Sequence, residues 1–86
     1  MIIDFHKKFY KRYEKLPIKF QQKIDLALDV FAKNPLDPVL RNHALHGSLH
    51  NARAIWVTGD IRIIFREYEH YYFVLMLDVG THNQVY

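Results

Sequence analysis

The most constraining feature of the chain is a run near its C-terminus, Tyr71–Val79 (YYFVLMLDV), that is apolar at almost every position. A strand with one face in solvent alternates apolar and polar side chains, whereas a strand covered on both faces is apolar throughout. The run is too short to cross a membrane as a helix, which needs about 20 apolar residues. We therefore expect Tyr71–Val79 to be the central strand of a sheet.

Two shorter segments before this run have the period of two that is typical of strands. In residues 52–57, Arg53, Ile55 and Val57 alternate with Ala54 and Trp56. In residues 61–68, one face carries Ile61, Ile63 and Phe65, and the other carries Arg62, Ile64 and Arg66. The turn residues Thr58-Gly59-Asp60 separate the first two segments, and residues 67–70 separate the second from the third. Short turns of this kind predict three antiparallel strands in a meander.

Helical spacing dominates the first third of the chain. Apolar residues recur three or four apart, which predicts two amphipathic helices. The first stripe is Phe5, Phe9, Tyr13 and Leu16, and the second is Phe20, Ile24, Ala27, Leu28 and Phe31. Pro17 separates the helices and Pro35 ends the second one. A link of about two residues makes the helices fold back as a hairpin.

Together with a short strand at Met1–Phe5, these elements give the order β-α-α-β-β-β over a single domain, residues 1–86. Helices and strands in separate runs are typical of the α+β class. We expect an antiparallel sheet with a two-helix hairpin packed on one face. The chain has no cysteine, which excludes disulfides and thiolate metal sites. It also has no secretory signal pattern, and we expect a cytoplasmic protein without a membrane partner.

Positive charge is concentrated at the start of the chain. Residues 1–23 contain six lysines and one arginine against Asp4 and Glu14, although the net charge of the whole chain is only +3. A basic face of this kind suits nucleic acid or an acidic protein. It is equally consistent with an ordinary solvated helix surface.

Three histidines lie in the long connector at residues 34–51, at positions 43, 46 and 50. Their spacing would place them on one face of a helix, as metal ligands often are. However, the prolines upstream and Gly47 disfavour a helix there, and no cysteine or glutamate accompanies the histidines. A connector of this length in a small domain is usually functional. We expect no metal and no cofactor.

Hairpin connectivity gathers a second set of polar residues. The last strand returns to the end of the sheet at which the preceding strand begins, so Asp60, Arg62, His82 and Tyr86 share one edge. A histidine or aspartate base, a histidine acid and an arginine for phosphate charge are sufficient for metal-free RNA cleavage. Trp56 or Tyr86 could stack on an unpaired base. Taken singly, Asp60 could be a turn residue, and each histidine or arginine an ordinary surface residue.

Three motifs of the second half of the chain resemble the RelE/ParE toxin superfamily, and in particular its YafQ-like branch. They are the segment Asn42–Gly47 (NHALHG), the Gly-Asp turn before an apolar strand, and the terminal GTHNQVY. The preceding NPLDP also fits this branch. The resemblance implies the same β-α-α-β-β-β fold over the whole chain, and a toxin of a type II toxin–antitoxin system.

By this resemblance the catalytic residues are His43, Asp60 and His82, and Tyr86 holds the RNA. The chain departs from the family pattern at Trp56, where a histidine is common, and at Ile61, where a tryptophan is common. Arg62 and Arg53 are then expected to take the phosphate role. His46 and His50 are further candidates for substrate binding.

The resemblance implies a ribosome-dependent endoribonuclease that cleaves mRNA and is held inactive by a cognate antitoxin. Two alternatives remain: a non-enzymatic ParE-like toxin that blocks DNA gyrase, and an inactive relative that only binds its antitoxin. We also expect deletion of residues 81–86 to abolish toxicity at little cost to the fold.

Overall fold

The computed structural model describes all of residues 1–86 and confirms an α+β fold with a helical hairpin. Five strands form one sheet in the order β1-β5-β4-β3-β2. The strands are β1 (Ile2–Phe5), β2 (His43–Ala44), β3 (Arg53–Trp56), β4 (Ile61–Tyr68) and β5 (Phe73–Thr81). The helices are α1 (Lys7–Lys15), α2 (Ile18–Lys33) and α3 (His82–Val85), with short 3-10 turns η1 (Pro38–Leu40) and η2 (Gly47–Leu49). None of the helices combines the length and apolarity that crossing a membrane requires.

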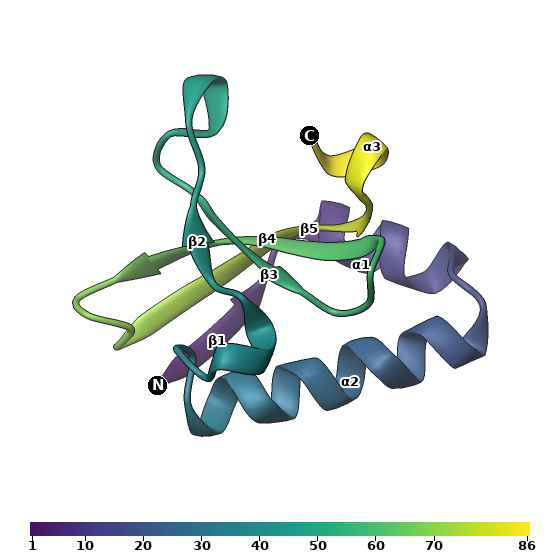
Figure 1. Cartoon of the computed structure of the whole chain (residues 1–86), viewed down its shortest axis with the longest axis horizontal. Coiled ribbons are helices and arrows are strands. Elements are labelled where there is room, and N and C mark those ends of the chain that lie inside the picture. Colours follow the sequence, from purple (N-terminus) through teal and green to yellow (C-terminus); the bar gives the residue numbers. More distant parts are fainter.

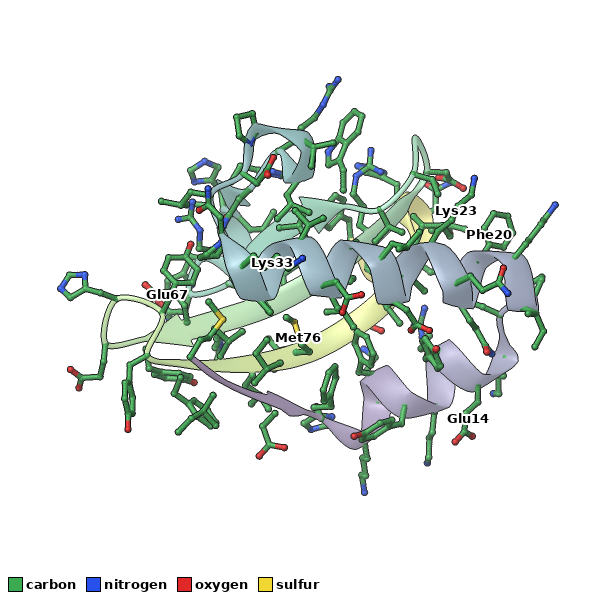
Figure 2. All side chains as sticks on the ribbon, turned by 90° about the horizontal axis from the view of Figure 1, so that it is seen from below. Glu14, Phe20, Lys23, Lys33, Glu67 and Met76 are labelled. Carbon is green, nitrogen blue, oxygen red and sulfur yellow. The ribbon has the colours of Figure 1, made fainter.

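The two long helices are separated at Pro17, and the second one ends before Pro35, as predicted from the sequence. His6 caps α1, since its Nδ1 accepts the backbone N–H of Lys8. Helix α2 starts directly after Pro17 and ends at Lys33, with Asn34 as its C-cap before Pro35. Figure 1 shows α2 running along one side of the sheet, while α3 and the teal loop that contains η2 lie on the opposite side. Figure 2 views the molecule from the side of α2 and shows Lys23 and Lys33 on that helix.

The sheet is antiparallel from β2 to β5, as expected for the meander, but β1 pairs with β5 in parallel. The expectation of an antiparallel sheet is therefore wrong for its first strand. The physical reason is the helical hairpin, which carries the chain away from β1 and makes the β1–β5 pairing a long-range one that no local turn dictates. The central position of β5 between β1 and β4 confirms the expectation drawn from its apolar run.

A larger core lies between the helices and the sheet. It includes Phe9 and Phe31 from the helices and Ile63, Phe65 and Met76 from the central strands. Figure 2 shows Met76 on the sheet behind the helices. A smaller core lies on the opposite face, hereafter the second face. It consists of Ala52, Ala54, Ile64 and Val85, with Leu45, Leu49 and Leu77 packed around it.

The connector at residues 34–51 contains a short strand, although its prolines disfavour regular structure. His43 and Ala44 form β2, which pairs with β3 so that His43 lies opposite Ala54. This two-residue strand was not predicted, because two residues carry no readable periodicity. The pairing of β2 with β3 brings the connector back along the sheet. His43 therefore lies on the same sheet as Arg62.

The last residues form a short helix rather than a frayed tail. The Thr81 backbone N–H donates to Oε1 of Gln84, and the Thr81 side chain accepts from the Gln84 backbone in return, which is a capping box. Val85 is 9 % exposed and belongs to the second core. The C-terminal segment therefore contributes to folding, in contrast to the expectation that its deletion would cost the fold little.

Candidate functional site

Six residues of the second face line a pocket of about 390 Å³, hereafter the Arg62 pocket. They are Arg41, His43, Trp56, Arg62, His82 and Tyr86. Arg41 follows η1, and His43 is in β2. Trp56 and Arg62 lie opposite each other on β3 and β4. His82 begins α3, and Tyr86 directly follows that helix. In Figure 1 the wall formed by β2 and the wall formed by α3 rise from the same side of the sheet. The pocket thus collects residues from distant parts of the sequence.

Arg62 is the most unusual residue of this pocket, because it is only 6 % exposed and has no acidic partner. The ion pairs of the chain join Asp78 to Lys8 and to Arg12 only. The Arg62 guanidinium instead donates to the carbonyl oxygens of Thr58 at 2.9 Å, Gly59 at 3.1 Å and Ile61 at 3.3 Å. Burying a charge is costly unless it is paired. The site therefore holds a positive charge that an anionic ligand would stabilise.

Trp56 lies between two guanidinium groups. The Arg62 carbon Cζ lies 3.9 Å from the centre of the indole ring, and the Arg41 Cζ lies 4.1 Å from it. Arg62 reaches the ring because it is directly opposite Trp56 across β3 and β4. Arg41 reaches it because its left-handed backbone, with φ of 50°, turns the chain after η1. The indole thus holds two cations in one place, by cation–π attraction.

Sequence reasoning missed Arg41. No spacing or motif marks this residue, and its place depends on the turn η1 and on the pairing of β2. The motif NHALHG, which begins at the next residue, was the nearest available signal.

His43 and His82 stand on opposite walls of the pocket, and both are exposed. Nδ1 of His43 lies 2.8 Å from the carbonyl oxygen of Arg41. A carbonyl only accepts, so Nδ1 of His43 carries the proton and Nε2 is left free to accept one. His82 begins α3, and its backbone N–H donates to the carbonyl oxygen of Asp60 at 3.0 Å. One histidine is thus arranged as a proton acceptor, facing a second titratable ring.

Tyr86 packs edge-on against His82, with ring centres 4.4 Å apart. Burial raises the pKa of the Tyr86 phenol above its ordinary value, and the nearby positive charge of Arg62 offsets part of that rise. The phenol is therefore protonated at neutral pH and remains a hydrogen-bond donor at the mouth of the pocket.

Four residues expected in the site lie outside this pocket. The exposed Asp60 reaches the site through its backbone, by the bond to His82, and not by its carboxylate. Arg53 faces the helices' side of the sheet, and its Nε donates to Oδ1 of Asn42 at 2.8 Å. His50 lines a separate pocket with Arg53, and the exposed His46 precedes η2.

The metal hypothesis for the connector histidines has no geometric support. No group of three or more histidine, aspartate or glutamate side chains gathers closely enough to hold a metal ion. His43 belongs to β2 and His50 follows η2, so the three residues do not share a helix. Ile61, at the position where the family often has tryptophan, is 3 % exposed in the larger core and cannot stack on a ligand.

The chain matches one known protein family over almost its whole length. A family model described as "Bacterial toxin of type II toxin-antitoxin system, YafQ" matches residues 2–86. Among proteins with curated functions, no match was found.

Solved structures share the fold of the chain at low sequence identity. YafQ from E. coli strain BL21(DE3) is 19 % identical with a TM-score of 0.83, covering 98 % of this chain and 96 % of that one. A YoeB/ParE toxin from Agrobacterium tumefaciens is 14 % identical with a TM-score of 0.78, covering 95 % and 99 %. The toxin–antitoxin complex RelBE2 from Mycobacterium tuberculosis contains a chain 20 % identical with a TM-score of 0.74, covering 94 % and 96 %.

Proposed function

The chain belongs to the YafQ family of bacterial type II toxins, and on this basis we propose that it is an endoribonuclease that cleaves mRNA on the ribosome. The observation that supports the proposal most strongly is the buried, carboxylate-free Arg62 between two histidines. A phosphodiester is the anion that an arginine fork beside a proton acceptor and a proton donor suits best.

The reaction is an attack of the ribose 2′-hydroxyl on the adjacent phosphorus. Nε2 of His43 takes the hydroxyl proton, and the bond from O2′ to phosphorus forms. Arg62 and Arg41 stabilise the additional negative charge on the phosphate oxygens. The bond to the 5′-oxygen breaks as protonated His82 donates its proton to that oxygen. The products are a 2′,3′-cyclic phosphate and a 5′-hydroxyl, and no metal takes part in these steps.

The remaining residues of the pocket hold the RNA in place. Tyr86 offers an aromatic surface for an unpaired base, whereas the ring of Trp56 is already stacked between Arg41 and Arg62. Asp60 is a positioning residue, because its carbonyl oxygen fixes the first turn of α3 and so the place of His82. Arg53, with its bond to Asn42, supports the wall formed by β2 rather than the phosphate.

The modest net charge of the chain supports the proposed dependence on the ribosome. A net charge of +3 provides little general attraction for free RNA, since affinity for a polyanion grows with the number of phosphates neutralised. A ribosome that presents mRNA in a fixed pose would supply the orientation that the protein lacks.

We also propose a cognate antitoxin as partner. The related RelBE2 chain was solved in a toxin–antitoxin complex. The basic α1 and α2 surface suits an acidic segment that folds on binding.

The test is RNA cleavage with and without ribosomes. We expect purified protein to cut mRNA on programmed ribosomes in the presence of excess EDTA, and a 2′-deoxy substitution at the cleaved nucleotide to abolish the cut. Intact mRNA together with DNA damage on induction would contradict the proposal in favour of a gyrase toxin. Unaffected growth at high expression would instead indicate an inactive antitoxin-binding relative.

A further inference from the structure

A second pocket lies on the same face as the Arg62 pocket, on the other side of Val85. Its volume is about 200 Å³, and we call it the Asp78 pocket. Ile64, Leu77, Leu49 and Val85 give it apolar walls, while His6, Lys8 and Asp78 supply its polar groups. Apolar walls with a few polar groups are typical of sites that bind small molecules.

Asp78 is the charged residue that distinguishes this pocket. Its side chain is 8 % exposed, and Oδ1 accepts the backbone N–H of Val79 at 2.9 Å and lies 3.6 Å from Nε of Arg12. Oδ2 lies 3.3 Å from Nζ of Lys8, whose own side chain is 57 % exposed. A carboxylate oxygen accepts more than one hydrogen bond. Oδ2 therefore retains acceptor capacity, and its lysine is free to move towards solvent.

A β-bulge brings Asp78 and Leu77 to the same pocket. Ile64 of β4 pairs with Asp78, and the next residue, Phe65, pairs with Met76, so Leu77 is the extra residue of β5. Successive residues normally point to opposite faces of a sheet. The bulge breaks this alternation, and an apolar wall and an acceptor therefore lie side by side on the second face.

His6 adds a donor. Its Nδ1 accepts the backbone N–H of Lys8 at 3.1 Å. In a neutral imidazole whose Nδ1 is an acceptor, the proton is on Nε2. The same pocket thus offers an N–H from His6 and a carboxylate oxygen from Asp78.

The two pockets are neighbours along one strand. Arg62 and Ile64 are two residues apart on β4, about 7 Å along the strand, and both face the second side of the sheet. Helix α3 separates them, with Tyr86 on the side of Arg62 and Val85 on the side of Asp78. A single strand of RNA whose phosphate sits at Arg62 would have an adjacent base within reach of the Asp78 pocket.

We propose that the Asp78 pocket binds the base of a nucleotide next to the phosphate held at Arg62, and that it selects adenine or cytosine over uracil. Adenine and cytosine present an amine beside a ring-nitrogen acceptor, which matches the Asp78 carboxylate beside the His6 N–H. Uracil can pair one carbonyl with the His6 N–H and its single N–H with Asp78, but its second carbonyl then lies beside the carboxylate, which repels it. The inference rests on the proposed function, because it places RNA at Arg62.

Binding of mononucleotides tests the pocket without any cleavage. NMR signals of the methyl groups and of the Trp56 indole N–H are recorded for the whole protein during titration with AMP, CMP and UMP. We expect AMP and CMP to shift the methyl signals of Leu77 and Val85, with dissociation constants about tenfold lower than that of UMP. Asp78→Asn gains an amide donor and should remove this difference, whereas the exposed Asp29→Asn should preserve it.

A second variant covers the case in which Asp78→Asn fails to fold. Leu49 is outside the ion pairs of Asp78, and Leu49→Phe fills the pocket from η2. We expect it to abolish the Leu77 and Val85 shifts while nucleotide phosphate still perturbs the Trp56 signal. Shifts confined to Trp56 in the wild type, or equal binding of UMP, would overturn the inference. If AMP and CMP bind selectively at Leu77 but the protein cuts no RNA, the base-binding inference is supported and the proposed endoribonuclease activity is refuted.

Discussion

The guanidinium of Arg62 stacks on the indole of Trp56 at 3.9 Å, with no carboxylate beside either residue. The Arg62 guanidinium donates to three carbonyl oxygens, which belong to the β3–β4 turn and to its own strand. These hydrogen bonds hold the guanidinium in position, and the guanidinium in turn holds the indole of Trp56. This arrangement presents a positive charge to the pocket without neutralising it.

Replacing Arg62 should separate activity from stability. Arg62→Met removes a cation that has no buried anionic partner, so no uncompensated charge is left behind and the carbonyls of the turn regain water. We expect the free energy of unfolding to change by no more than about 1 kcal/mol, while cleavage falls by roughly 100-fold or more. Urea unfolding and ribosome-dependent cleavage measure the two quantities.

Arg66→Met, on the exposed part of the same strand, is the matched control and should leave both quantities unchanged. A strongly destabilised Arg62→Met with undiminished cleavage would mean that the arginine is purely structural.

Trp56 should report ligand binding directly, because it is the single tryptophan of the chain. Phosphate that contacts both Arg41 and Arg62 at the rim of the indole changes the electric field on the ring, so the Trp56 fluorescence should change on titration with inorganic phosphate. Arg41→Ala removes one of the two cations and should weaken phosphate binding about tenfold. Lys33→Ala, on the exposed surface of α2, should have no effect, and an equal loss in both variants would argue for non-specific attraction.

Gly80→Ala should impair the site more than the fold. A Cβ at Gly80 would lie 2.6 Å from Oε1 of Gln84, which is the end of a flexible side chain. The side chain can move away, but the capping bond to Thr81 is then lost and α3, with His82 and Tyr86, is held less firmly. We expect a cleavage rate several-fold lower with a loss of stability of about 1 kcal/mol.

Gln84→Ala provides the comparison for Gly80→Ala. It removes the same cap without the added methyl group, so the double variant should be no worse than either single variant. Additive losses would show that Gly80 acts by some route other than Gln84.

The C-terminal helix should matter to folding through Val85 and to function through Tyr86. Val85→Ala removes buried methyl groups from the second core and should cost roughly 1–2 kcal/mol in urea unfolding. Tyr86→Ala removes a side chain that is 43 % exposed, so it should leave stability nearly unchanged and lower the cleavage rate. The reverse pattern, with a stability loss at Tyr86 only, would mean that the aromatic ring is the structural anchor.

Alkaline pH should weaken the fold through two tyrosines. The hydrogen bond from Tyr13 to Asp25, at 2.7 Å, raises the pKa of the Tyr13 phenol, as burial does for Tyr86. The folded state therefore retains these protons more strongly than the unfolded state does, and the contribution to stability is fully present below the unfolded pKa of about 10. It is lost as the pH rises from there through the higher folded pKa.

Urea unfolding between pH 9 and 11 measures this dependence. Tyr13→Phe and Tyr86→Phe should each flatten the decline relative to the wild type, whereas Tyr72→Phe, on an exposed side chain, should not. A decline that is identical in all four proteins would contradict the assignment.

Much of the architecture was readable from periodicity. The stripe from Phe20 to Phe31 and the alternation from Ile61 to Phe65 are each long enough for a period to be distinguished, because one face of each element is buried in the larger core. The same reasoning missed β2 and α3, which have two and four residues and are held by pairing and capping rather than by a repeated pattern.

Some residues of the candidate site could be predicted from the sequence, and others could not. His43, Arg62, His82 and Tyr86 were predicted, and the structure brings them into one pocket. His46 and His50 shared a spacing with His43 but are carried away by η2, which is not a continuous helix. Asp60 contributes a backbone carbonyl, a role that its side chain could not signal.

The α+β class, the helical hairpin and the end of the sheet at which the polar residues meet can all be predicted from the amino-acid sequence, because local periodicity and short turns specify them. Three features could be found only in the folded molecule: the burial of Arg62 without an anion, the contact of Arg41 with Trp56, and the bulge that places Leu77 beside Asp78. These depend on strand register and on contacts between residues far apart in the chain. A one-residue difference in register changes which side chains share a face, and no local pattern records it.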